Sequence, residues 1–236
     1  MTGLAVWLTV VGACDLVRAT RDTTSAVRRG AIAGLGASLL VLAGLVLGLS
    51  GAGLLLLAGW VATFLLWVLA SASALGRPGP VSRSVALAGL AAGLLLGLVA
   101  DGGLEPPSRH LPGVLGGLDP ELLLVAVGVG LVQLSTANVL VRLVLDAVGV
   151  PASANEKKLK GGRLLGPMER LFLVGLGSTG YLTAAAVVVA AKGLLRFPEL
   201  QRDERSGPSD VTEYFLIGSF GSWLVALAGV GLIGLV

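Results

Sequence analysis

The residues best suited to chemistry are ionisable side chains at the ends of two long apolar runs. Glu169 and Arg170 stand together before one run, Lys192 and Arg196 follow it with i,i+4 spacing, and Glu213 opens the next. About 21 residues of helix rising 1.5 Å per residue would hold Arg170 and Lys192 about 30 Å apart. We expect Lys192 or Arg196 to pair with Glu213 and so to clamp the two runs together.

A second set of polar side chains lies inside an apolar run. It consists of Gln133, Ser135, Thr136 and Asn138, followed by Arg142. Asn138 and Arg142 are separated by four residues and therefore share one face of a helix. The spacing predicts a polar stripe that hydrogen-bonds to neighbouring helices, and a polar path for a solute is the alternative.

Motifs of common catalytic and metal sites are missing. No zinc, nucleotide-binding or serine-hydrolase pattern occurs in the right context, and the single cysteine, Cys14, permits no internal disulfide. His110 stands alone on a proline-rich stretch. We therefore expect no catalytic residue, no cofactor and no metal, which weighs against an enzyme and leaves the question of an enzymatic activity open.

The composition decides the broad class. The chain has 236 residues, of which 55% are hydrophobic and only 13% charged, whereas a soluble domain carries about 25% charged residues. Disorder needs low hydrophobicity and high charge, and barrel strands alternate polar and apolar residues. What remains is a protein whose helices cross a membrane.

The charge-free stretches predict an all-α, polytopic transmembrane helical bundle of about seven spans, with six as the alternative. A crossing needs about 20 apolar residues. We place the spans at about 2–17, 30–49, 53–75, 84–100, 122–141, 171–191 and 215–236. This gives an N-terminal bundle over 1–150, a basic cytoplasmic loop over 151–170 and a C-terminal helical hairpin over 171–236.

The distribution of lysine and arginine predicts the orientation, because basic residues concentrate in cytoplasmic loops. The loops after the first, third and fifth spans hold most of them. This places the N-terminus outside and, with seven spans, the C-terminus in the cytoplasm. The loop between the sixth and seventh spans is the exception, since it holds Lys192, Arg196, Arg202 and Arg205. A re-entrant sixth span would change the assignment.

Small residues predict where helices pack closely. Gly89, Gly93 and Gly97 recur every four residues and form a groove without side chains. Such grooves let helix backbones approach within lipid, where water exclusion gives no driving force. The seam serves either packing within the chain or contact between chains.

The region from Gly161 to Ala226 resembles the C-terminal membrane portion of an uncharacterised family of bacterial inner-membrane proteins with a domain of unknown function. The resemblance rests on an entry pattern, an exit pattern and the start of the last span. These fall on Gly162, Arg163, Gly166, Glu169 and Arg170; on Ala190, Ala191, Lys192, Arg196 and Phe197; and on Glu213, Tyr214, Leu216, Ile217, Gly218 and Ser219. It covers about a quarter of the chain, departs from the pattern at Gly193, and implies no activity.

Three classes of function follow from these patterns. The first is a non-enzymatic scaffold or accessory subunit of a membrane complex, whose basic loops contact partner proteins or anionic lipid headgroups; a homo-oligomer belongs to this class. The second is a small transporter or channel with a polar path along the fifth and sixth spans. The third is an enzyme acting on lipid headgroups. The net charge of +3 suits anionic lipid and gives no reason to expect nucleic acid.

Overall fold

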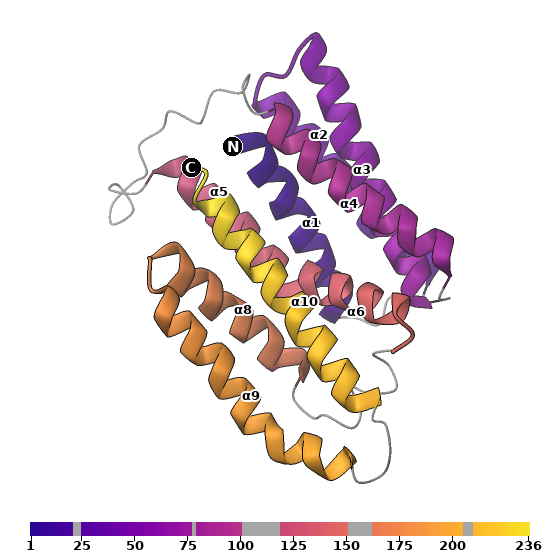
Figure 1. Ribbon diagram of the computed structural model, residues 1–236. Coiled ribbons are helices and arrows are strands. Elements are labelled where there is room, and N and C mark those ends of the chain that lie inside the picture. Colours follow the sequence, from indigo (N-terminus) through magenta and orange to yellow (C-terminus); the bar gives the residue numbers. More distant parts are fainter. Residues whose placement is uncertain (21–24, 77–78, 101–118, 151–161, 205–209) are drawn as a thin grey trace. The chain divides into compact units, whose positions relative to one another are not determined.

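The computed structural model describes residues 1–20, 25–76, 79–100, 119–150, 162–204 and 210–236, and these form helices and no strand. The prediction of an all-α helical membrane bundle is confirmed. The chain divides into two compact units, Met1–Thr136 with Leu235–Val236, and Ala137–Gly234. Figure 1 labels their helices.

Six helices in the described residues are long and apolar enough to cross a membrane, so the alternative of six spans fits better than seven. They cover Thr2–Ala19, Ala26–Val46, Ala52–Gly76, Pro80–Val99, Pro120–Ala147 and Thr212–Ile233. The chain is therefore an integral, multi-pass membrane protein.

Helix α1 (Thr2–Thr20) is the centre of the first unit. It contacts α2 (Ala26–Val46), α3 (Ala52–Gly76), α4 (Pro80–Ala100) and α5 (Pro120–Leu131), and it lies between α5 and the group α2–α4 (Figure 1). Its side chains Leu4, Trp7 and Val11 are fully buried. The first span is thus the core of this unit.

The glycine seam lies on α4 and faces helices of the same chain. A Cβ atom on Gly93 would overlap the ring of Trp7, and one on Gly97 would lie 2.6 Å from Leu4 Cδ1. At Gly89 it would lie 3.0 Å from the backbone nitrogen of Trp67 on α3. The missing side chains therefore let α4 pack directly against α1 and α3.

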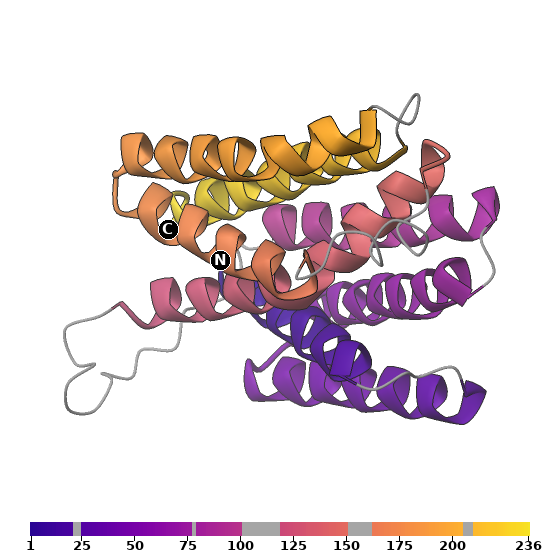
Figure 2. The same ribbon diagram turned by 90° about the horizontal axis from the view of Figure 1, so that it is seen from below.

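The second unit contains α6 (Ala137–Ala147), α8 (Gly162–Ser178), α9 (Leu182–Glu204) and α10 (Asp210–Ile233). Helix α10 contacts the other three. Helices α8 and α9 run side by side in opposite directions and are joined at one end (Figures 1 and 2).

This hairpin corrects the predicted crossing span over 171–191. The chain reverses at Gly180, whose φ of +84° lies in the left-handed region. The Tyr181 N–H bonds to the Leu176 carbonyl at 2.8 Å, and the Gly180 N–H bonds to the Gly177 carbonyl at 3.2 Å. These two bonds form a Schellman motif, which ends a helix. The apolar run is therefore folded double instead of extended.

The predicted boundaries also differ from the structure. The two units divide between Thr136 and Ala137, whereas the sequence placed a boundary at 150. Helix α8 begins at Gly162, so residues 162–170 are helical and not part of a loop. The rest of that predicted loop, 151–161, and the stretch with His110 lie outside the described residues.

Candidate functional site

A buried charged site lies in the second unit, where Glu169 on α8 meets α9 and α10. One carboxylate oxygen of Glu169 pairs with the ammonium group of Lys192 on α9. The other accepts a hydrogen bond of 2.7 Å from the indole N–H of Trp223 on α10. The Glu169 residue is only 7% exposed, so both carboxylate oxygens are engaged inside the protein.

The neighbouring Arg170 points in a different direction from α8, because successive residues of a helix point about 100° apart. Its Nη1 donates to Ser222 Oγ on α10 at 2.9 Å, and its Nη2 donates to Asn138 Oδ1 on α6 at 2.6 Å. The guanidinium is buried, with the residue 2% exposed. Glu169 and Arg170 thus connect one helix to all the other helices of the unit.

Aromatic rings complete this site, which we call the Glu169 cluster (Glu169, Arg170, Lys192, Trp223, Ser222 and Asn138). The Lys192 ammonium lies 5.8 Å from the ring centroid of Phe215 and 5.9 Å from that of Trp223. A cation at this distance from an aromatic face is attracted by the ring's negative potential. The lysine is therefore held by one carboxylate and two rings.

The cluster departs from the pairing predicted by the sequence. Lys192 was expected about 30 Å from Glu169 and beside Glu213, but the hairpin brings it back to Glu169. Because Lys192 pairs with Glu169, the predicted Lys192–Glu213 pair is wrong, whereas the alternative Arg196–Glu213 pair stays a prediction. The side chain of Arg196 lies outside the described residues. Three charged residues that sequence analysis divided between two membrane faces, Glu169, Arg170 and Lys192, therefore lie together.

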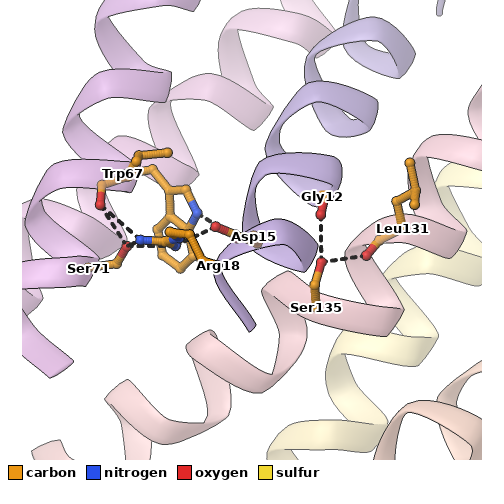
Figure 3. Close-up of polar contacts among 8 residues, drawn as sticks. Gly12, Asp15, Arg18, Trp67, Ser71, Leu131 and Ser135 are labelled. Atoms are coloured by element: carbon orange, nitrogen blue, oxygen red, sulfur yellow. Dashed lines mark hydrogen bonds and ion pairs between the residues drawn. The ribbon is translucent and has the colours of Figure 1, made fainter. Parts of the chain in front are cut away.

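A second charged site lies in the first unit, between α1 and α3 (Figure 3). Asp15 pairs with Arg18 one turn later, as their i,i+3 spacing predicts. Asp15 Oδ2 also accepts a hydrogen bond of 2.9 Å from Trp67 Nε1. Arg18 Nη1 donates to the Val68 carbonyl at 3.0 Å and to Ser71 Oγ at 3.1 Å. The pair is thus bonded to three residues of α3, which makes it an interhelical contact.

The predicted polar stripe begins at a π-helical turn, Val132–Thr136, that follows α5. Ser135 Oγ lies 2.7 Å from the Gly12 carbonyl on α1 and 2.8 Å from the Leu131 carbonyl, and donates to this pair of acceptors (Figure 3). Gln133, Ser135 and Thr136 are each only 1% exposed. This part of the stripe therefore lies inside the helix packing of the first unit.

The rest of the stripe belongs to the second unit. Asn138 accepts from Arg170, and Arg142 makes polar or electrostatic contacts of its own. Two residue types were missed by sequence analysis, namely the tryptophans that donate to carboxylates and the serines that accept from arginines. The tryptophans carried a weak signal, since an indole N–H buried in an apolar helix usually finds a partner.

The bonds of the two charged sites hold neighbouring helices together, and this arrangement favours a structural role over a catalytic one. No group of three or more His, Cys, Asp or Glu side chains suited to a metal ion occurs in the part of the chain that the structure describes.

A scan against protein-family models, a search of the curated proteins and a search of the solved structures each found no match. The resemblance over 161–226 to a bacterial membrane family therefore stays a prediction.

Proposed function

We propose that this membrane protein is a non-catalytic scaffold or accessory subunit of a membrane complex. The observation that carries the proposal is that the buried ionic side chains Asp15, Glu169 and Arg170 each bond to neighbouring helices of their own unit. Charges in these positions join helices and leave the loops to contact partners.

The energetics support this role. Removing one partner of a buried ion pair costs about 3–5 kcal/mol, because the other charge is left without compensation. A transport or catalytic group has to exchange its partners during each cycle, whereas both oxygens of Glu169 are already engaged by Lys192 and Trp223. A set of bonds this complete suits a fixed framework.

We place the protein in the cell membrane with its N-terminus outside. Six crossings put the C-terminus on the same side, in place of the cytoplasmic C-terminus expected from seven spans. With this topology every one of the 17 lysine and arginine residues except Arg109 lies in or next to a cytoplasmic segment. A bias of this strength is what the positive-inside rule favours.

The partners follow from that charge. Residues Lys157, Lys158 and Lys160 concentrate positive charge in the segment between α6 and α8. Each basic residue near an anionic membrane surface contributes about 1 kcal/mol to attraction. The segment therefore suits anionic headgroups or an acidic face of a partner protein in the same complex.

Gentle extraction from native membranes tests the scaffold role. We expect a partner to co-purify in a fixed ratio and to be lost when Lys157, Lys158 and Lys160 are all changed to Gln. The matched control changes Arg21, Arg28 and Arg29 to Gln, which removes the same charge from another cytoplasmic segment and should keep the partner. Absence of any partner in a fixed ratio contradicts the proposal.

A small transporter is the second candidate, and the π-helical turn favours it. Such turns often mark functional sites, and this one carries the buried side chains of Gln133, Ser135 and Thr136. Solute movement by the purified protein in liposomes, lost with Gln133→Ala and kept with Ser73→Ala on the exposed face of α3, would replace the scaffold proposal with this one.

A further inference from the structure

The α8–α9 hairpin carries exposed apolar side chains, but the apolar part of each arm is too short to cross a bilayer. Only Leu182–Leu194 of α9 is apolar, which is about 18 Å of helix at 1.5 Å per residue. Neither arm is among the six helices that are long and apolar enough to cross. Since neither arm crosses the bilayer, the exposed apolar side chains of the hairpin have to be covered in another way.

We propose that the α8–α9 hairpin is a re-entrant element, inserted into the cytoplasmic leaflet, and that lipid acyl chains cover its exposed apolar face. In this placement α8 enters and α9 leaves the bilayer on the side that carries the basic residues, and the turn at Gly180 reaches the middle of the bilayer. This placement is independent of the scaffold role proposed above.

The length of the hairpin matches one leaflet. Glu169 and Ser178 are separated by about 14 Å of helix, and Leu182 and Lys192 by about 15 Å. Half of a hydrocarbon core is also about 15 Å thick. The pair Glu169–Lys192 therefore lies at the level of the headgroups when the turn lies at the midplane.

The side chains on the outside of the hairpin suit lipid. Phe172 is 59% exposed, Leu182 61% and Val187 62%. No charged residue occurs between Arg170 and Lys192. A surface that is free of charge along its whole length, carries large exposed apolar side chains and ends at a charged pair has the pattern of a lipid-facing element and not of a water-facing one.

The turn limits the cost of placing a bend in hydrocarbon, where an unsatisfied backbone group costs several kcal/mol. The N–H groups of Thr179, Gly180 and Tyr181 all bond to carbonyls of α8. The hydroxyls of Ser178 and Thr179 bond back to the carbonyls of Val174 and Gly175 at 2.7 and 2.8 Å. The donors at the α8 end of the bend are thus satisfied without water.

Sidedness is the first part of the test, and it uses the full-length protein with single cysteines in a Cys14→Ala background. We expect Lys158→Cys and Ser206→Cys, which flank the hairpin, to react with a membrane-impermeant maleimide only after the cells are permeabilised. Arg109→Cys should react in intact cells. If position 158 or position 206, but not both, reacts in intact cells, the segment crosses the membrane and the proposal is overturned.

Depth is the second part, measured in lipid vesicles by the access of oxygen and of a water-soluble nickel chelate to spin labels. We expect the ratio of oxygen access to chelate access at Thr179→Cys to match Leu224→Cys, a 57% exposed position near the middle of α10. The ratio should fall several-fold through Val187→Cys to Leu194→Cys. Tyr181→Cys takes the place of Thr179→Cys as the labelled position at the turn if the label at 179 disturbs the turn.

Other occupants of this surface give different results. Equal ratios at 179, 187 and 194 would show a hairpin lying flat on the membrane, and high chelate access at all three would show one in water. Low access of both reagents with dipolar coupling between labels would show a second copy of the chain. Each of these outcomes overturns the proposal and leaves the partner experiment for the scaffold role unaffected.

Discussion

At the scale of single residues, tryptophan side chains supply the donors that hold carboxylates in both units. Trp67 donates to Asp15 and Trp223 donates to Glu169. An indole N–H on an otherwise apolar ring can bond to a carboxylate while its ring fills the space between helices. The same pairing of acid, base and indole is thus used twice, on different helices.

Two tryptophans of α3 allow the worth of this bond to be measured. Trp67→Phe removes the donor to Asp15, whereas Trp60→Phe removes an indole N–H that has no acceptor among the described residues. Both side chains are buried, so the lost volume is matched. Because hydrogen bonds to charged groups contribute about 1.5–3 kcal/mol, we expect Trp67→Phe to be less stable than Trp60→Phe by this amount. Thermal unfolding in detergent is the measurement, and equal melting temperatures would contradict the account.

The Glu169 cluster yields a prediction about charge balance. Glu169→Gln keeps an acceptor for Trp223 but leaves the Lys192 ammonium without its carboxylate, so we expect a loss of about 3 kcal/mol. The double variant with Lys192→Met should recover most of this loss, since it removes the uncompensated charge. The control Glu213→Gln, at an exposed position, should change little.

Thermal unfolding of these variants and of Lys192→Met alone gives the interaction energy of the pair by a double-mutant cycle. A double variant whose loss of stability equals the sum of the two single losses would show that the pair is not coupled. The Asp15–Arg18 pair could be predicted from sequence because its residues are one helical turn apart. The tryptophan contacts could not, since no local pattern links a carboxylate to an indole 52 residues away.

At the scale of helices, side-chain-free surfaces set how closely α4 approaches its neighbours. The ring of Trp7 occupies the space that a Cβ atom on Gly93 would need. The spacing of the three glycines predicted a seam. It did not indicate that the opposing surface would come from α1, because nothing in the spacing identifies the partner helix.

Gly93→Ala tests the close approach of α4 to α1. Since the added methyl group overlaps Trp7, α4 has to shift, and overpacking of this kind costs about 1–3 kcal/mol. Gly34→Ala is the matched control, because a Cβ atom there has no neighbour within 4 Å and alanine favours helix over glycine by up to about 1 kcal/mol. We expect a lower melting temperature for Gly93→Ala and an equal or higher one for Gly34→Ala. The reverse order would contradict the packing.

The largest difference between prediction and structure, the predicted crossing span over 171–191, also lies at the scale of helices. The stretch 171–191 has the length and composition of a crossing span, and hydropathy alone cannot distinguish an extended helix from one folded double. Two signals pointed to the fold, namely the glycines around Ser178 and Thr179 and the four basic residues that a seventh span would place outside. Both agree with the turn observed at Gly180.

At the scale of the whole molecule, the number of crossings decides which side each charge faces. The class of the protein could be predicted from composition, because a backbone in lipid is satisfied only in helices or closed barrels and these charge-free runs lack the alternation of barrel strands. The number of crossings could not be predicted without the hairpin. A segment that turns back instead of crossing leaves every later residue on the other side of the membrane from the side predicted. With six crossings and the proposed placement of the N-terminus outside, Arg109 would be the only basic residue of the sequence left outside.

The side of the membrane on which each terminus lies tests this account most directly. Short epitope tags before Met1 and after Val236 can be probed with antibodies in intact and in permeabilised cells, with Lys158→Cys labelling as an internal marker of the cytoplasmic side. We predict that both tags bind antibody in intact cells. A tag after Val236 that binds only after permeabilisation would show an odd number of crossings and would contradict both the six-span topology and the re-entrant hairpin.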